Sequence, residues 1–383
     1  MIPLAAPNLN GNEREYLNHC IDTTFVSSVG EYVTKIEQMT AQKCNSAFGV
    51  ATSSGTTGLH LALVGSGVQP GDIVIIPSFT FIATANAVAH CGAIPWLMDI
   101  DIRSWTMDVE KLEKEIKKNT IWFGDALVHR DSGRKVAAVM PVYTLGNIPD
   151  MDKICELAHK FHLVVIADAA AAIGAELHKR KIGEITDLTV LSFNGNKTIT
   201  AGGGGMILGD DEVFMRKLKH LSTTARVTVE YDHDMVGYNY RMTNIQAAIA
   251  CAQMERMEEL VGQKRKIREY YKEQFKDIDN VNLFPDQING IGADWLSGIV
   301  LKNGSIEEVR YICAQLKRKE IEARSFWKPV HLQKPYQSAL RAETLEVSEQ
   351  VWDKIITLPC STNITEEELK YVSDMVKEIL IKF

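Results

Sequence analysis

The sequence predicts an α/β protein built around one large, mostly parallel sheet, with a smaller α/β unit after it. Two observations lead to this prediction. Short apolar runs of the kind that form buried strands alternate with helical patterns through the first two thirds of the chain. After residue 243 a long run of helical spacing begins, and a second, shorter alternation of strand and helix follows it.

Five short apolar runs are the candidate strands of the large sheet, and helical patterns lie between them. They cover residues 72–76, 94–100, 135–142, 163–168 and 187–193. In the helical segment 151–162, Ile154, Leu157 and Ala158 recur at the spacing that places them on one face, against a sheet. Strands joined by crossover helices run parallel, so we expect one mostly parallel sheet.

The smaller unit is predicted from the last third of the chain. A helical pattern covers 243–275, a strand candidate lies at 295–301, and a second helix is expected over 305–319. A final helix opens with a capping signature at Thr365 and Glu368. We therefore predict two closely packed domains, which cover residues 1–250 and 251–383.

Composition excludes several classes of function. The chain of 383 residues has a net charge of −7, and its basic residues are mixed with acidic ones, so binding to nucleic acid is not expected. No apolar run approaches the roughly 20 residues that span a bilayer, and the N-terminus lacks a signal-peptide pattern, so we expect a cytoplasmic protein without membrane contact. The seven cysteines show no CxxC spacing, so no metal site is expected.

Candidate functional residues lie where predicted strands end, because ligands bind beyond the carboxyl ends of parallel strands. Asp168 ends one run, and Lys197 follows another. Residues 53–57, SSGTT, open a helical pattern with hydroxyls and free backbone N–H groups, which suits an anion such as phosphate. Each feature has an ordinary alternative, since the acid could be structural and the hydroxyls could only cap the helix.

The four glycines 202–205 do not indicate a dinucleotide site. They precede a strand candidate instead of joining a strand to a helix, and no GxGxxG occurs there, so we discount NAD. Taken together, an amine, a carboxylate and an anion cradle at strand ends match the needs of pyridoxal 5'-phosphate. That cofactor takes a lysine for its Schiff base, a carboxylate for its ring nitrogen and donors for its phosphate.

Several stretches resemble the DegT/StrS-type sugar aminotransferases, and the resemblance spans nearly the whole chain. The matching stretches are SSGTTGLHLAL at 53–63, PSFTFIATANAV at 77–88, ADAAAAIGA at 167–175, SFNGNKTIT at 192–200 and GYNYRMTNIQAAI at 237–249. The resemblance implies the aspartate aminotransferase fold, PLP fold type I. It also implies pyridoxal phosphate as cofactor and L-glutamate as the amino donor.

The resemblance assigns roles to individual residues. It makes Lys197 the Schiff-base lysine that also relays the proton, and Asp168 the partner of the ring nitrogen. Gly55, Thr56 and Ser192 would hold the phosphate, and Phe81 would stack on the ring. A phenylalanine in such an apolar stretch would otherwise be a core residue.

Further roles carried over by the resemblance involve a second subunit and the substrate. Asn239 would reach the phosphate in the neighbouring subunit of a homodimer with shared active sites; its alternative is a turn residue. Arg324, Trp327 and His331 would approach the substrate. Ser325 stands where the family usually has proline, which leaves the path of this loop open, and a lone histidine is often only packed.

The motif ADAAAAIGA departs from the family pattern at two positions. The family usually has glutamate at the position of Ala167, and glutamate, histidine or glutamine at that of Ala171. The second position ordinarily lies beside the cofactor ring. Alanine there removes one polar contact and is expected to alter the pKa of the cofactor or the rate.

Within the family, residues 22–33 and 122–152 look most like the branch that acts on the bacillosamine and legionaminic acid pathways. Enzymes of this branch aminate C4 of a nucleotide-linked 4-keto-6-deoxy-N-acetylhexosamine, and we expect the nucleotide to be UDP. One alternative is a perosamine synthase-like enzyme for a GDP-linked 4-keto sugar, which shares much of the 237–249 segment. Relatives that dehydrate sugars have histidine at the lysine position, so Lys197 argues against that reaction. A catalytically silent sensor or partner protein is the last alternative, supported only by Ala167 and Ala171.

Overall fold

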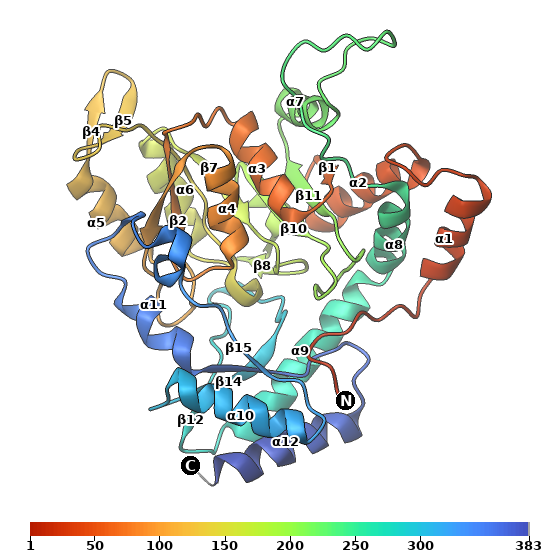
Figure 1. Cartoon of the computed structure of the whole chain (residues 1–383), viewed down its shortest axis with the longest axis vertical. Helices are drawn as coiled ribbons and strands as arrows, with labels where there is room; N and C mark the ends of the chain where they lie inside the picture. Colours follow the sequence, from red (N-terminus) through yellow and green to blue (C-terminus); the bar gives the residue numbers. More distant parts are fainter. Residues whose placement is uncertain (382–383) are drawn as a thin grey trace.

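The computed structural model describes residues 1–381, and an eight-stranded sheet with helices on both faces is its main feature (Figure 1). In spatial order the strands are β1 (Phe48–Thr52), β11 (Gly205–Gly209), β10 (Leu188–Ser192), β7 (Val164–Asp168), β6 (Val136–Val139), β2 (Ile73–Pro77), β3 (Ile94–Met98) and β16 (Leu340–Arg341). From β10 to β16 neighbouring strands run parallel, whereas β11 is antiparallel to both β1 and β10. The predicted α/β fold with a mostly parallel sheet is confirmed, and all five predicted runs form strands in it.

The sheet is buried on both faces because successive side chains of each strand point to opposite layers. In β2, Ile73 and Ile75 belong to one apolar cluster, and Val74 and Ile76 to another. The first layer comprises α1 (Glu13–Asp22), α2 (Glu31–Cys44), α5 (Val109–Asn119), α6 (Met151–Lys160) and α8 (Asn244–Glu255). The second comprises α3 (Gly55–Gly65), α4 (Ile82–His90) and α7 (Glu212–Ser222).

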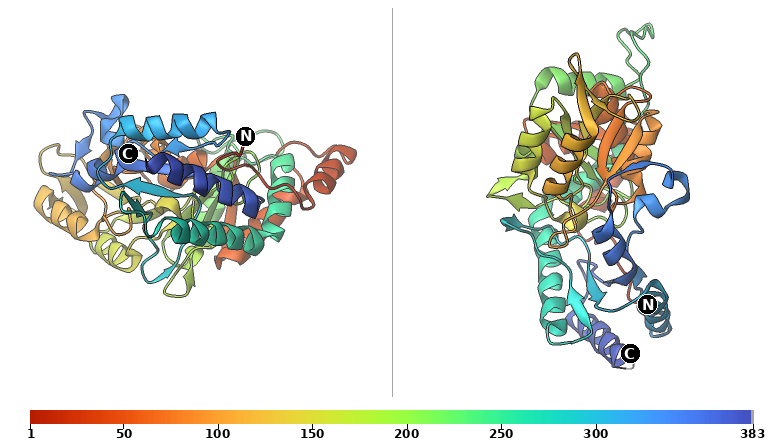
Figure 2. Two further views of the ribbon diagram at one scale, coloured as in Figure 1. Left: turned by 90° about the horizontal axis from the view of Figure 1, so that it is seen from below. Right: turned by 90° about the vertical axis from the view of Figure 1, so that its left-hand side faces the viewer.

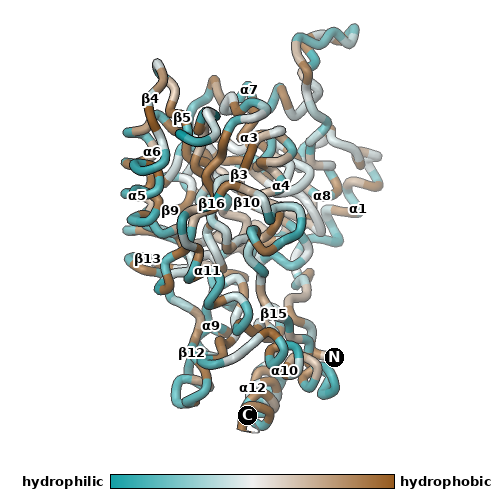
Figure 3. Tube along the Cα trace, turned by 60° about the vertical axis from the view of Figure 1, so that its left-hand side comes forward, coloured by the Kyte–Doolittle hydropathy of each residue, from teal (hydrophilic) through white to brown (hydrophobic). Residues whose placement is uncertain are grey.

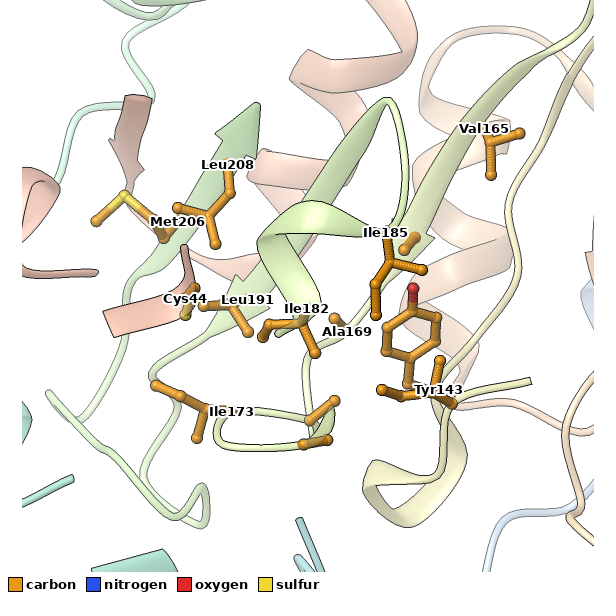
Figure 4. Packing of buried hydrophobic residues seen from close by; sticks show 14 of the residues in the cluster. Cys44, Tyr143, Val165, Ala169, Ile173, Ile182, Ile185, Leu191, Met206 and Leu208 are labelled. Atoms are coloured by element: carbon orange, nitrogen blue, oxygen red, sulfur yellow. The ribbon is translucent and has the colours of Figure 1, made fainter. Parts of the chain in front are cut away.

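Part of the first layer is a tightly packed cluster beneath the strand ends, in which Tyr143, Ala169, Ile182 and Ile185 lie close together (Figure 4). Tyr143 is 1% exposed, and its hydroxyl has no hydrogen-bond partner among the described residues. Burial raises the pKa of this phenol well above its ordinary value. The ring is therefore held by apolar packing alone, and this packing supports the loop that leads from β6 to α6.

Polar caps determine where many of the helices begin. In each case a side-chain oxygen accepts a hydrogen bond from a backbone N–H of the first turn. The capping residues are Ser54, Asp108, Asp150, Asp211, Thr243, Ser305 and Thr365. The predicted capping signature is confirmed, because Thr365 and Glu368 form a reciprocal capping box. Short 3₁₀ turns cover Thr144–Gly146, Ile182–Glu184, Val330–Leu332, Lys334–Tyr336 and Trp352–Lys354.

The C-terminal third forms a second core around a four-stranded antiparallel sheet, which lies below the large sheet along the long axis (Figures 1 and 2). Its strand order is β12 (Val281–Leu283), β14 (Ser297–Leu301), β17 (Ile355–Leu358) and β15 (Arg324–Ser325). Helices α9 (Met257–Phe275), α10 (Ile306–Arg318) and α12 (Glu366–Leu380) pack with it, and α11 (Glu346–Val351) leads back to β17.

The long helical pattern over 243–275 is two helices and not one. The break lies at Arg256, whose φ of −103° and ψ of 14° leave the helical region between α8 and α9. No glycine or proline marks the break in the sequence. The Arg256 guanidinium instead pairs with Glu259 in the first turn of α9, at 2.7 Å, so a local side-chain contact accompanies the change of direction.

The chain crosses between the two cores at places other than α9. Strand β16, from the C-terminal third, pairs with β3 and forms one edge of the large sheet (Figure 3). In the opposite direction, Ile2 forms a bridge with Ile321, and the carbonyl of Leu4 accepts a hydrogen bond from the N–H of Cys360 at 2.7 Å. The predicted boundary between residues 250 and 251 stays a prediction, and the last two residues of the predicted second domain, 382–383, lie outside the described residues.

Two small sheets complete the fold. One is the hairpin of β4 (Thr120–Phe123) and β5 (Ala126–His129), and the other joins β13 (Gly290–Ile291), β8 (Glu176–Leu177) and β9 (Arg180–Lys181). Over residues 1–381, no helix has both the length and the apolar character needed to cross a bilayer. The same residues contain no group of three or more His, Cys, Asp or Glu side chains that could hold a metal ion.

A tight turn at Gly146 receives the segment that leads into β14. Gly146 has a φ of +94°, and a Cβ atom there would lie 2.6 Å from the Cβ of Ala293 and 2.9 Å from the carbonyl oxygen of Ala171. The Gly146 carbonyl accepts a hydrogen bond from the N–H of Ala293 at 3.2 Å. Both the backbone conformation and the close approach therefore require glycine.

We expect Gly146→Ala to lower the free energy of unfolding by about 1–3 kcal/mol, because the side chain adds both strain and overlap. Gly262→Ala is the matched control, since Gly262 lies within α9 and a Cβ there meets no atom within 4 Å. The control should be neutral or more stable, by up to about 1 kcal/mol. Denaturant titration of both variants checks this, and equal stability of the two would contradict it.

Candidate active site

A cavity of ≈ 280 Å³ lies at the carboxyl ends of β7 and β10, where the sheet meets the start of α3. Seven of the residues selected from the sequence line it together. They are Gly55, Thr56, Phe81, Asp168, Ser192, Lys197 and Trp327. The structure thus brings the candidate amine, the carboxylate and the helix start around one space.

Lys197 lies in the loop after β10, and its side chain is half-buried. Its Nζ is 3.6 Å from the centre of the Trp295 ring. Burial lowers the pKa of the Lys197 amine to about 8; the carboxylate of Asp168 opposes this change, and the charge of Lys264 adds to it. About a tenth of this amine is therefore neutral, and so nucleophilic, at pH 7, far more than for an ordinary lysine.

Asp168 ends β7 and is 6% exposed. Its carboxylate accepts hydrogen bonds from the Thr84 hydroxyl at 2.7 Å and from the N–H of Ala170 at 3.2 Å. Burial nevertheless raises the pKa of Asp168 above its ordinary value, and these two donors and the charge of Lys197 oppose the rise. Such a carboxylate favours a cationic partner within the cavity.

The start of α3 lies at the cavity, where the sequence predicts an anion cradle. Ser54 caps the helix by accepting from the N–H of Thr57, and Gly55 and Thr56 line the cavity just inside the positive end of the helix. A Cβ atom on Gly55 would lie 2.9 Å from the Cβ of Ser192. Glycine therefore lets the helix start approach Ser192 closely, which concentrates donors at one point.

Aromatic side chains form the wall of the cavity that faces the second core. The rings of Phe81 and Trp327 are 6.1 Å apart, and Trp327 stacks on Phe326 at 4.3 Å. Phe81 is 54% exposed although it is a large apolar residue. Its exposure toward a cavity suits a residue that packs against a planar ligand.

The other three predicted residues do not line the cavity. Asn239 is exposed, next to Tyr240, whose carbonyl accepts from the N–H of Ser53 at 2.7 Å. Arg324 is exposed and pairs with Glu322.

His331 is 3% exposed and lies in residues 328–348, which follow Trp327 and include β16; we call these residues the return segment, because β16 returns to the large sheet. One ring nitrogen contacts the Ser78 hydroxyl at 2.6 Å, and the other contacts Glu349 at 3.0 Å. Burial lowers the pKa of His331. Through these contacts His331 fastens the return segment to Ser78, the residue after β2, and its predicted role at the substrate stays a prediction.

Sequence reasoning missed several residues of the cavity. Trp295, Asn194 and Asn196 line it, and Thr84 holds Asp168 from behind. Both asparagines precede Lys197 in SFNGNK, so their position close to the lysine was a usable signal. Trp295 precedes β14 in the distant second core, and no local pattern links it to Lys197.

The two alanines that depart from the family pattern have different surroundings. Ala171 lines the cavity, so a polar side chain is missing from its wall. Ala167 is fully buried within β7, where it pairs with Thr189 of β10. Of the two departures, only that at Ala171 bears directly on the cavity.

The residues present fit pyridoxal 5'-phosphate. Gly55, Thr56 and Ser192 would hold its phosphate, Asp168 its ring nitrogen and Lys197 its carbonyl carbon. The fit rests on a buried carboxylate, an amine of lowered pKa and a helix start that open into one cavity. Fold and cavity together thus define a pyridoxal phosphate-dependent enzyme.

Comparisons with known proteins agree with this class. The model of the DegT/DnrJ/EryC1/StrS aminotransferase family matches residues 7–377, and the chain belongs to this family. Its cofactor is pyridoxal phosphate, and membership speaks against a catalytically silent protein.

Three relatives align over most of the chain. A GDP-perosamine synthase of Caulobacter vibrioides is 37% identical over 382 residues, which cover 99% of this chain and 98% of that protein. A GDP-perosamine synthase of Escherichia coli O157:H7 is 34% identical over 378 residues, with 98% of each chain covered. A UDP-N-acetyl-3-dehydro-alpha-D-glucosamine 3-aminotransferase of Acidithiobacillus ferrooxidans is 30% identical over 363 residues, 94% of this chain and 91% of that protein.

Solved structures share the fold. The putative sugar aminotransferase Spr1654 from Streptococcus pneumoniae, in its PMP form, has a TM-score of 0.90 at 22% identity, with 100% of both chains covered. Helicobacter pylori PseC, an aminotransferase of pseudoaminic acid biosynthesis, has a TM-score of 0.89 at 20% identity, again over 100% of both chains. The predicted PLP fold type I architecture is confirmed.

We expect Lys197 of the cofactor-free protein to react with an amine-selective reagent with a midpoint near pH 8, because its pKa is about 8. Below this pH the amine is protonated and inert, and above it the amine is neutral. An exposed lysine such as Lys370, whose pKa is raised by Asp374, should react only at higher pH. Peptide mass spectrometry of samples labelled for a short time checks this, and a common midpoint for both lysines would contradict it.

Proposed function

We propose that this enzyme transfers an amino group from L-glutamate to C4 of a GDP-linked 4-keto-6-deoxyhexose. The support for the nucleotide comes from the relatives, since those named GDP-perosamine synthase are 37% and 34% identical over almost the whole chain. The support for amino transfer is the cavity that joins Lys197, Asp168 and the start of α3. This cavity is the observation on which the proposal mainly rests.

The GDP-linked sugar replaces our first expectation from the sequence, a UDP-linked 4-keto-6-deoxy-N-acetylhexosamine. We keep the UDP-linked sugar as the second candidate, because the Acidithiobacillus relative acts by name on a UDP-linked sugar and is 30% identical. Both candidates are nucleotide-linked keto sugars, and they require the same chemistry at the reacting carbon.

When bound, pyridoxal phosphate supplies an electron sink that stabilises negative charge on the carbon that loses its proton. The protein supplies positions and protons. Lys197, with a pKa of about 8, can accept and return a proton near neutral pH. Asp168 would keep a positive charge on the ring nitrogen, and α3 with Ser192 would neutralise the phosphate.

The remaining cavity surface would meet the sugar. Phe81 and Trp327 offer apolar faces, whereas Asn194 and Asn196 offer donors and acceptors beside Lys197. Asn194 already donates to Asn196 at 3.2 Å, so the pair presents a fixed polar edge. Hydroxyl groups of a hexose suit such an edge.

We also propose that the enzyme is a homodimer in which Asn239 completes the partner's phosphate site. Asn239 is exposed and does not line its own cavity, although the backbone beside it binds Ser53 next to α3. The segment before it projects from the molecule (Figure 1) and exposes large apolar side chains, with Val229 80% and Val236 87% exposed. Apolar side chains exposed in this way mark a protein interface.

The substrate proposal predicts that the enzyme with glutamate converts a GDP-linked 4-keto-6-deoxyhexose, with release of 2-oxoglutarate. The UDP-linked 4-keto-6-deoxy-N-acetylhexosamine should be converted at least about 100-fold less efficiently, measured as kcat/KM. A coupled assay for 2-oxoglutarate measures both substrates. Lys197→Ala should be inactive with either sugar, and a preference for the UDP-linked sugar would overturn the proposal.

The dimer proposal predicts complementation between two inactive variants. In a mixed dimer of Lys197→Ala and Asn239→Ala chains both defects fall in the same site, because Asn239 serves the partner's site, so the other of the two sites is intact. Reassembly of an equal mixture from denatured chains should recover about a quarter of the wild-type activity. A mixture as inactive as its parents, with mixed dimers demonstrated by mass spectrometry, would rule out the shared site.

A further inference from the structure

We propose that Trp295 is a positioning residue for Lys197, whose indole holds both the backbone that precedes the lysine and the lysine amine itself. This inference rests on the proposed role of Lys197. Nothing in the sequence near Lys197 indicates it, because Trp295 comes from the second core and enters the cavity from the opposite side.

The indole contacts two consecutive residues of the lysine loop through two different parts of the ring. Its Nε1–H donates a hydrogen bond to the carbonyl oxygen of Asn196 at 2.8 Å. Its face lies under the Nζ of Lys197, 3.6 Å from the ring centre. An ammonium group at this distance is attracted by the negative face of the ring. One side chain thereby restrains both ends of the flexible lysine.

Trp295 is itself fixed at several points. Its backbone N–H donates to the carbonyl of Leu145 at 3.0 Å, and its carbonyl accepts from the Cys360 thiol at 3.8 Å. Its ring packs on Trp327 with centres 5.9 Å apart, and the residue is 4% exposed. The indole is therefore a rigid surface against which the amine can rest.

The charged groups that act on the amine make such a surface useful. Asp168, from β7, attracts the ammonium form, and Lys264, from α9, repels it. Lys264 is 3% exposed and is held by the carbonyl of Cys360 at 2.7 Å, so its charge cannot move away. Without the indole, the ammonium would be drawn toward the carboxylate of Asp168, which the cofactor's ring nitrogen would need as its partner. The ring face holds the ammonium without a counter-charge and releases it when the proton leaves.

The first test observes the indole directly in cofactor-free protein, without substrate. The chain has six tryptophans, so labelling with 5-fluorotryptophan gives six ¹⁹F NMR signals, and Trp295→Phe identifies that of Trp295 by its loss. We expect this signal to shift with pH, with a midpoint near 8, as Lys197 loses its proton. The shift should vanish in Lys197→Met. The signal of Trp122, which stacks on Phe161 at the β4–β5 hairpin, is the internal control and should not change with the Lys197 variant.

A Trp295 signal that does not titrate near pH 8, or that titrates equally in Lys197→Met, overturns the inference. Neither result bears on the proposed reaction, because no sugar or glutamate is present. Conversely, failure to aminate any keto sugar leaves the titration intact, so the two proposals fail separately.

The second test compares Trp295→Phe with Trp295→Leu in the complete enzyme. Phenylalanine keeps an aromatic face, whereas leucine removes it and leaves an apolar side chain. If the face positions the amine, kcat should fall roughly 100-fold in the leucine variant and less than about 10-fold in the phenylalanine variant, with KM for the sugar little changed. A rise in KM with kcat preserved would instead make Trp295 a sugar-binding surface and overturn the inference.

Discussion

The parallel pairing of β7 with β10 is the constraint on which the rest of the site depends. Leu188 pairs with Ile166 and Val190 with Asp168, so the two strands end at the same edge of the sheet. This register places the Asp168 carboxylate beside the loop that carries Lys197. Because β11 returns antiparallel to β10, the chain must reverse between Ser192 and Gly205, and Gly202 and Gly204 allow the turn into β11 with φ values of 71° and 100°.

The cavity holds its acid and its base in unfavourable surroundings. Burial raises the pKa of Asp168 and lowers that of Lys197, so both groups are driven toward their neutral forms. Two donors to Asp168 and the indole face beneath Lys197 only partly compensate for lost hydration. A ligand that brings a cationic ring nitrogen and a phosphate anion would restore favourable partners to the carboxylate and to the start of α3. The cofactor's charges would therefore offset the cost of burying the carboxylate and the amine in the cavity.

Much of the large sheet and its nearby site residues could be predicted from the sequence, because the relevant signals are local. Buried parallel strands read as continuous apolar runs, and a ligand at their carboxyl ends must meet residues at or beyond the end of a run, as with Asp168 and Lys197. The likeness to a known family added Phe81 and Trp327, which no periodicity distinguishes from core residues.

The break at Arg256 was missed because the sequence there lacks the glycine or proline that would indicate it. Trp295 and Thr84 were missed because their importance lies in contacts with residues about 100 and 84 positions away. The enclosure of the His331 ring by Ser78 and Glu349 could not be predicted, because sequence position alone does not reveal which groups surround a ring.

The return segment that carries His331 and β16 has a consequence for motion. Asp99, at the end of β3, accepts hydrogen bonds from the N–H groups of Val347 and Ser348, so the segment is fastened along the large sheet from Ser78 to Asp99. Ile2 and Leu4, from the N-terminal segment, also bind Ile321 and Cys360 of the second core, so several separate segments of the chain connect the two cores. These separate connections are incompatible with free opening and closing of the two cores about a single hinge. Access to the cavity must therefore come from shifts of single loops or of side chains that line it, such as Phe81, which is 54% exposed.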